Sequence, residues 1–163
     1  MDMQDELFRR LKNRSNRDGN MTKELGLTVT EITAGTAVGS IRFVDSSVNP
    51  RHLVHGGALF GVMDQLAGLA ACTTGYGVVT INGTIEFLRP TKPAEPLTCT
   101  ATVLKPGRRF TTCEAVITSD ISGKLISKGT FTYCMMEELK RTVKLVEQSD
   151  PTDEFTAPAT KTP

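Results

Sequence analysis

Residues 49–74 read NPRHLVHGGALFGVMDQLAGLAACTT, and this stretch decides the fold. Apolar residues recur in it at helical spacing, as Leu59, Val62, Met63, Leu66, Leu69 and Ala70. Gly75 or Gly77 then supplies a stop signal. The pattern predicts one long helix from about Gly56 to Thr74.

A single charge lies inside this helix. Between Arg51 and Glu86 only Asp64 is formally charged, although an average of 23% charged residues predicts about eight charges over such a length. The face around Asp64 carries small residues where a solvated helix would carry Lys or Glu, namely Gly57, Gly61, Gly68 and Ala71. Both sides of the helix must therefore be covered, and the carboxylate left inside is a candidate for chemistry.

The segments around the helix carry strand-like patterns. Before it, Leu25, Leu27 and Val29 alternate with small and polar residues, and after an Ala34-Gly35 turn a β-rich run follows, which predicts a hairpin. After the helix come four strand-like runs, at 77–88, 96–104, 110–119 and 125–135. A short amphipathic helix is expected at 5–12, before a polar segment at 13–20. This order predicts an α+β domain with a largely antiparallel sheet.

Length and composition narrow the class of protein. A chain of 163 residues is expected to form one domain, and its formal charge of +1 argues against a nucleic-acid binder. The N-terminus has no apolar segment of a secretory signal, so a cytoplasmic location is expected. The glycine-rich stretch from Leu53 to Ile81 is poor for a membrane span. Buried free thiols are expected for the four widely spaced cysteines, Cys72, Cys99, Cys113 and Cys134.

The pattern Asn49-x5-His55-Gly56-Gly57-x6-Asp64, followed by a half rich in hairpins, resembles the hotdog-fold acyl-CoA thioesterases of the phenylacetate-degradation (PaaI-like) type. The resemblance covers about residues 25–135. It implies a long helix wrapped by a curved, largely antiparallel sheet, and two subunits that join their sheets. The expected parts are an N-terminal helix and linker (1–24), the hotdog domain (25–136) and a polar, disordered tail (137–163).

The chemistry of thioester hydrolysis suits the start of this helix. Negative charge develops on the carbonyl oxygen, and main-chain N–H groups at a helix N-terminus stabilise it. Gly56 matches the family's oxyanion donor, and both Gly56 and Gly57 lack a Cβ that would hinder the approach of a substrate. Asp64, the one carboxylate of the segment, would attack the carbonyl or activate a water.

Helix geometry predicts that one chain does not complete this site. Eight residues of helix separate Gly56 from Asp64, or about 12 Å, too far for both to act on one carbonyl. Asp64 is therefore expected to serve a second copy, whose helix would run alongside in the opposite sense against Gly61, Gly68 and Ala71. The resemblance likewise implies a homodimer, assembled further into a homotetramer.

Five further positions near the helix match family residues or lie beside one. Asn49 matches the Asn that orients the water or carbonyl, or is simply a turn residue before a proline. His55 matches the His beside the oxyanion loop, or makes a structural hydrogen bond to the backbone. Thr80 matches a Ser or Thr beside the catalytic carboxylate, or reflects β-propensity alone. Asn82 and Gly83 lie close enough to take its place in contacting the substrate.

Three basic residues, Lys105, Arg108 and Arg109, flank the Pro106-Gly107 turn. The resemblance places a contact to a coenzyme A phosphate here, which arginine suits, although a solvated turn has the same composition. Arg89 is a weaker candidate of this kind. No cofactor is expected beyond coenzyme A as part of the substrate. No metal is expected either, because helix length separates Asp64 from His52 and His55.

The predicted function is hydrolysis of a small-molecule acyl-CoA thioester to a free acid and coenzyme A. Two alternatives remain: a non-catalytic protein that binds or senses acyl-CoA, and a hotdog hydratase or dehydratase. The second has a different arrangement of catalytic Asp or Glu and His. No motif supports a Ser-His or Cys-His nucleophile.

Overall fold

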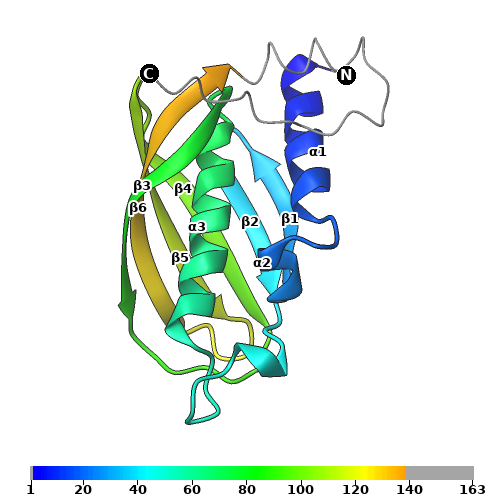
Figure 1. Cartoon of the computed structure of the whole chain (residues 1–163), viewed down its shortest axis with the longest axis vertical. Helices are drawn as coiled ribbons and strands as arrows, with labels where there is room; N and C mark the ends of the chain where they lie inside the picture. Colours follow the sequence, from blue (N-terminus) through cyan, green and yellow to red (C-terminus); the bar gives the residue numbers. More distant parts are fainter. Residues whose placement is uncertain (1, 139–163) are drawn as a thin grey trace, which may run out of the picture.

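The computed structural model describes residues 2–138 of the chain, and the expected disordered tail therefore lies almost wholly outside the described residues. Its elements are, in order, α1 (Met3–Ser15), α2 (Met21–Glu24), β1 (Leu27–Thr33), β2 (Thr36–Ile41), the 3-10 turn η1 (Asp45–Ser47), α3 (Gly56–Cys72), β3 (Tyr76–Phe87), β4 (Leu97–Lys105), β5 (Phe110–Ser119) and β6 (Leu125–Glu138) (Figure 1). None of the helices in this part of the chain is long and apolar enough to cross a membrane.

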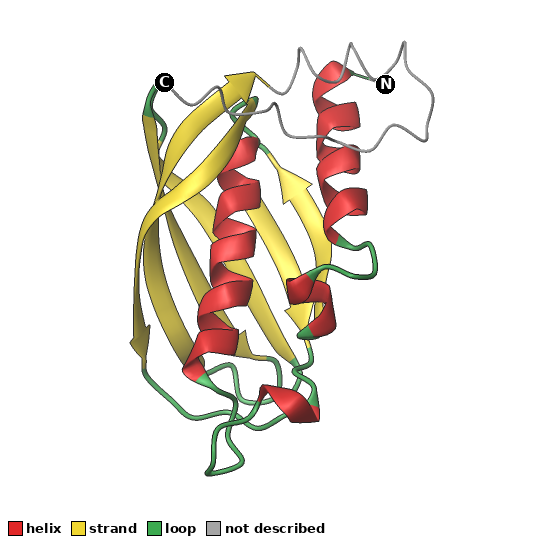
Figure 2. Ribbon diagram, viewed as in Figure 1, coloured by secondary structure: helices red, strands yellow, loops and turns green. Residues whose placement is uncertain are grey.

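The strands form one six-stranded antiparallel sheet in the order β1-β2-β4-β5-β6-β3. The sheet curves around α3, which packs on its concave face (Figure 2). Apolar residues of α3 such as Val62, Met63 and Leu66 are fully buried against inward-facing strand residues such as Ile117 and Phe131. The predicted α+β class and antiparallel sheet are confirmed.

Both ends of α3 are built by local hydrogen bonds. His55 caps the start, because its Nδ1 accepts the N–H of Gly57 at 2.9 Å. At the other end the hydroxyls of Thr73 and Thr74 donate to the main-chain oxygens of the preceding turn, at 2.6 and 2.7 Å. Gly75 follows with φ of 99°, a conformation that favours glycine. The long predicted helix is confirmed to within two residues at its end.

The small residues of α3 accept close neighbours from the same chain. A Cβ on Gly61 would lie 3.3 Å from the Cε of Met21, and one on Gly68 would lie 3.5 Å from the Cε1 of Tyr133. Ala71 is fully buried. Neighbours from α2 and β6 thus cover part of the face on which a second copy's helix was expected, while Gly61 and Gly68 stay half-buried.

The N-terminal helix α1 is longer than predicted, and polar residues explain why. Asn16, just after the helix, donates to the main-chain oxygen of Val29 at 2.9 Å and accepts from its N–H at 2.8 Å. Lys12 donates to the oxygen of Thr30 at 2.6 Å, and Leu7 is buried. Asn16 and Lys12, near the expected end of the helix, thus hold α1 against β1 by hydrogen bonds, at one edge of the sheet (Figure 1).

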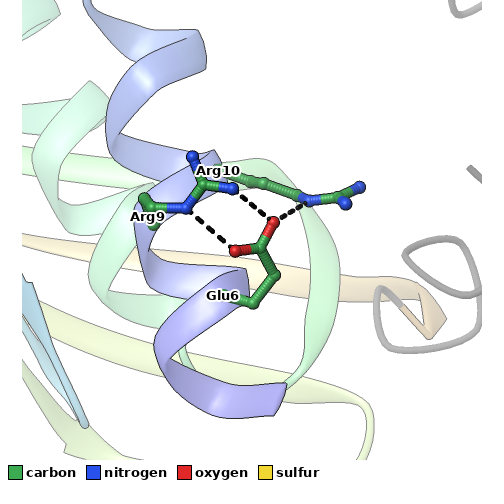
Figure 3. A network of polar contacts seen from close by, with 3 residues as sticks. All are labelled: Glu6, Arg9 and Arg10. Atoms are coloured by element: carbon green, nitrogen blue, oxygen red, sulfur yellow. Dashed lines mark hydrogen bonds and ion pairs between the residues drawn. The ribbon is translucent and has the colours of Figure 1, made fainter. Parts of the chain in front are cut away.

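The outer surface of α1 carries a small ionic network. Glu6 accepts from Arg9 at 2.9 and 2.7 Å and from Arg10 at 2.6 Å (Figure 3). Hydrogen bonds from Arg10 and Arg9 lower the pKa of Glu6. The side chain of Arg9 is 54% exposed and that of Arg10 34%, so solvent screens the two ion pairs and they contribute little to stability.

Gly83 of β3 fits under an aromatic pair. The Phe60 and Phe131 rings meet edge to face with centroids 5.3 Å apart, and a Cβ on Gly83 would lie 2.8 Å from an atom of each ring.

We expect Gly83→Ala to lower the free energy of unfolding by about 1–3 kcal/mol, because the buried Phe131 has no room to move. Thermal or urea unfolding measures the loss. Asn82→Ala, at an exposed position on the same strand, is the control and should change stability little; equal stability of the two variants would contradict the packing argument.

Candidate active site

Asp64 lies midway along α3, partly exposed, and its carboxylate is held on one side only. The hydroxyl of Thr80, on β3, donates to Oδ1 at 2.9 Å. The hydroxyl of Tyr133, on β6, lies 3.0 Å from the same Oδ1 and 2.8 Å from the main-chain oxygen of Asp64. Within residues 2–138 no group donates to Oδ2, so this oxygen remains open to a substrate or a water.

Tyr133 is a site residue that the sequence reasoning missed. It pairs directly with Thr80 in the β3–β6 ladder, and its side chain points inward with Phe131. Burial, and then the negative charge of Asp64, raise the pKa of Tyr133 above its ordinary value, so the hydroxyl stays protonated. The sequence signal that could have indicated Tyr133 was a tyrosine at an inward position of an apolar strand. A buried phenol needs a hydrogen-bond partner, so such a tyrosine is expected to contact a polar group in the interior.

The start of α3 forms a second group of candidate residues. The N–H of Gly57 is taken by the cap from His55, while no acceptor in the described part of the chain takes the N–H of Gly56. Because Nδ1 of His55 accepts, its proton is on Nε2. The structural reading of His55 is therefore supported. Gly56 is left with a free N–H at the positive end of the helix dipole, as an oxyanion donor requires.

A cleft of about 330 Å³ opens beside Gly56. Its walls are mainly apolar, with Leu59 and Phe87 among them, and its polar side chains include Asn49 and Arg89. The Oδ1 of Asn49 accepts from the N–H groups of Arg51 and Leu53 at 2.9 and 3.3 Å, which supports its turn role. Its amide nitrogen keeps its donors for the cleft, since no acceptor in residues 2–138 takes them.

The space above Gly56 is not empty. A Cβ on Gly56 would lie 2.9 Å from the Cζ of Phe87, so this ring stands where the sequence analysis expected only a substrate. Phe87 ends β3 and is 56% exposed. The absence of a Cβ at Gly56 therefore makes room for Phe87 in this structure.

The candidate residues of one chain fall into two groups that do not meet. Asn49, Gly56 and the cleft lie at the start of α3, whereas Asp64 and Thr80 lie two helical turns further on, roughly 12 Å along the axis. None of Asp64, Thr80 and Tyr133 lines the cleft. The free N–H of Gly56 and the carboxylate of Asp64 in one chain are thus too far apart to reach the same carbonyl.

The remaining predicted residues are spread over the sheet. Asn82 is exposed on β3, and Gly83 has the packing role described above. Lys105 ends β4, and Arg108 and Arg109 lie in the β4–β5 turn, with the guanidinium of Arg109 over the ring of Phe110 at 5.2 Å. The main chain near the end of β4 hydrogen-bonds to Gly35, and Gly35 hydrogen-bonds to Thr73, which directly follows α3. The basic turn is therefore at the opposite end of α3 from Gly56.

The four cysteines are free, as expected. Burial raises the pKa of Cys72 to about 11 and that of Cys113 to about 12. Burial also raises the pKa of Cys99. Because a thiolate is the reactive form, these three residues are poor nucleophiles.

Comparison with known proteins finds similarity to thioesterases. Residues 52–126 match the family model described as the thioesterase superfamily. Human acyl-coenzyme A thioesterase 13 is 27% identical over 116 residues, which are 69% of this chain and 83% of that protein. Escherichia coli acyl-coenzyme A thioesterase PaaI is 32% identical over 87 residues, 53% of this chain and 62% of that protein.

Solved structures show the same fold. The structure of E. coli PaaI matches with a TM-score of 0.72 at 23% identity, covering 81% of this chain and 97% of that one. A hypothetical thioesterase from Streptococcus pneumoniae, solved with coenzyme A, matches with a TM-score of 0.66 at 28% identity, covering 69% and 90%. The streptococcal protein has also been solved with alanine in place of one aspartate and, separately, of one threonine 16 residues further on.

Proposed function

We propose that this chain, which is similar in sequence and in fold to PaaI-like thioesterases, hydrolyses acyl-coenzyme A thioesters to a free acid and coenzyme A. The observation that carries the proposal is the carboxylate of Asp64, held through Oδ1 by two neutral hydroxyls and open at Oδ2. Asp64 and Thr80 are also 16 residues apart, the spacing of the two residues replaced in the streptococcal relative.

The proposed roles follow from the positions of the groups. Asp64 takes a proton from a water that attacks the carbonyl carbon, or attacks that carbon itself to form an anhydride that water then opens. The Gly56 N–H binds the oxygen that becomes negative. The tetrahedral intermediate then breaks its C–S bond, and the sulfur becomes the thiol of coenzyme A with the proton that Asp64 took from water or, in the anhydride route, with a proton from water. The walls of the cleft beside Gly56 would contact the acyl group.

We further propose that two copies join along β3 to complete each site. Its outer edge has no strand beside it in the described part of the chain, and it carries exposed apolar side chains: Val79 is 48% and Ile81 is 53% exposed. A twofold axis at this edge makes the two β3 strands antiparallel and sets the two α3 helices in opposite senses. Asp64 of one copy then faces the Gly56 N–H of the other. The basic turn with Lys105, Arg108 and Arg109 approaches the second copy's cleft, where a coenzyme A phosphate would lie.

Thiol release from a panel of short, long and aromatic acyl-CoA substrates tests the proposed activity. We expect turnover of at least one of these classes by the purified full-length chain, with stoichiometric appearance of acid and coenzyme A. Acyl-CoA binding without thiol release would instead support the non-catalytic alternative. Addition of water to an enoyl-CoA, without thiol release, would support a hydratase.

A further inference from the structure

A buried hydroxyl lies directly beneath the proposed catalytic carboxylate. Tyr133 is 1% exposed, and its ring packs beside Gly68 of α3, where a Cβ would lie 3.5 Å from the Cε1 of the ring. From there its hydroxyl lies 3.0 Å from Oδ1 of Asp64. The hydroxyl cannot reach a substrate, so any effect that it has on the reaction must pass through Asp64.

The hydroxyl has one proton and two acceptors within reach. The main-chain oxygen of Asp64, at 2.8 Å, already belongs to the hydrogen-bonded helix, whereas the carboxylate is the charged and therefore stronger acceptor. Thr80 gives its proton to the same Oδ1. Two donors from different strands thus converge on one oxygen and oppose rotation of the carboxylate.

The donor is present whenever the protein is folded. Burial keeps the phenol of Tyr133 protonated, and the negative charge of Asp64 adds to this effect; the other titratable groups that face it are Cys113 and Cys72. Burial raises the pKa of both thiols to about 12 and about 11, so neither is charged near neutral pH. The phenol therefore stays protonated near neutral pH and remains a hydrogen-bond donor.

We propose that Tyr133 is a positioning residue, which fixes Oδ1 of Asp64 and thereby presents Oδ2 to the thioester or its attacking water. This inference rests on the proposed thioesterase activity. It assigns a role to the hydrogen bond from β6, in addition to the contact from Thr80 that the family resemblance led us to expect.

Kinetics of Tyr133→Phe test the role, because phenylalanine keeps the ring and removes only the hydroxyl. We expect kcat to fall about 10- to 100-fold, the range for a hydrogen bond to a charged group, with KM changed less than threefold. Ser127→Ala is the matched control: it removes another buried hydroxyl of β6, one that contacts the sulfur of Met63, and should leave kcat unchanged.

A double-mutant comparison separates positioning from a general structural effect. In the Asp64→Asn background, Tyr133→Phe should cause no further loss, because the group through which it acts is gone. An equal loss in both backgrounds, or full kcat in Tyr133→Phe, would overturn the inference. If the wild-type chain releases no thiol from any acyl-CoA, the proposed thioesterase function fails. That outcome is distinct from a failure of the positioning role, which requires an active wild-type chain.

A spectroscopic measurement tests the contact itself, even if Tyr133→Phe does not fold. The chain has only two tyrosines, Tyr76 and Tyr133, so 3-fluorotyrosine gives two fluorine resonances that Tyr76→Phe assigns. We expect Asp64→Asn to move the resonance from position 133 and to leave that from position 76 in place. An unmoved resonance at 133 would show that the phenol does not bond to the carboxylate.

Discussion

Asp64→Asn is expected to reduce thiol release from acyl-CoA by about 10²- to 10⁴-fold, the usual contribution of a general base. Asparagine has the same shape but is neither a base nor a nucleophile. Its amide oxygen can still accept from Thr80, so the local structure should persist. Steady-state thiol release measures the loss, and calorimetry with a non-hydrolysable acyl-CoA analogue should show unchanged affinity.

Gln65→Ala provides the control for Asp64→Asn. Gln65 is the next residue of α3, but it lines a separate hollow between α3 and the end of α1 and has no bond to Thr80 or Tyr133 in the described structure. Its removal should leave kcat unchanged. Full hydrolysis by Asp64→Asn, with the substitution verified by mass, would contradict the assignment of the carboxylate.

Mixing two inactive variants is expected to restore activity to about one quarter of the wild-type value. One variant is Asp64→Asn and the other is Gly56→Pro, which removes the N–H that would bind the oxyanion. Proline suits the first position of a helix, and the extended backbone of His55 suits the residue before it. In a random mixture half of the twofold dimers are mixed, and each has one site with both groups intact.

Gly56→Ala is the matched control, because it places a Cβ against Phe87 as proline does but keeps the N–H. It should retain much more activity than Gly56→Pro. The mixture should be refolded together, and its activity followed as thiol release per chain. No recovery above the sum of the separate variants, with mixed dimers shown by mass spectrometry, would contradict a site shared between two copies.

The sequence was sufficient to predict the elements that depend on local signals. The helix α3 follows from the spacing of Leu59, Val62 and Leu66 and from a glycine stop, and β5 has the predicted limits because turns punctuate both of its ends. The helix α1 could not be bounded correctly, because its last turn is held by Asn16 and Lys12 through β1, and such tertiary bonds override local propensity.

The candidate site was predictable only in part, because some of its contacts form only in the tertiary structure. The contact of Thr80 with Asp64 was expected from the family resemblance and is present at 2.9 Å. Tyr133 is 69 residues from Asp64 in the chain, and no local pattern indicates which strand residue lies under a given helical turn. The ring of Phe87 above Gly56 has the same cause, since only the closed fold brings them together.

The bonds from Asn16 to Val29 also bear on how many copies can associate. A strand whose outer N–H and C=O groups are unpaired can accept another strand, and a sheet with two such edges can grow without limit. Here the middle of β1 has its outward groups taken by Asn16 and Lys12, so that edge cannot act as a template there. Of the two sheet edges in residues 2–138, only β3 then keeps its outward groups open, so the proposed pairing along β3 would end after one event and the bonds from α1 would block growth into a fibre.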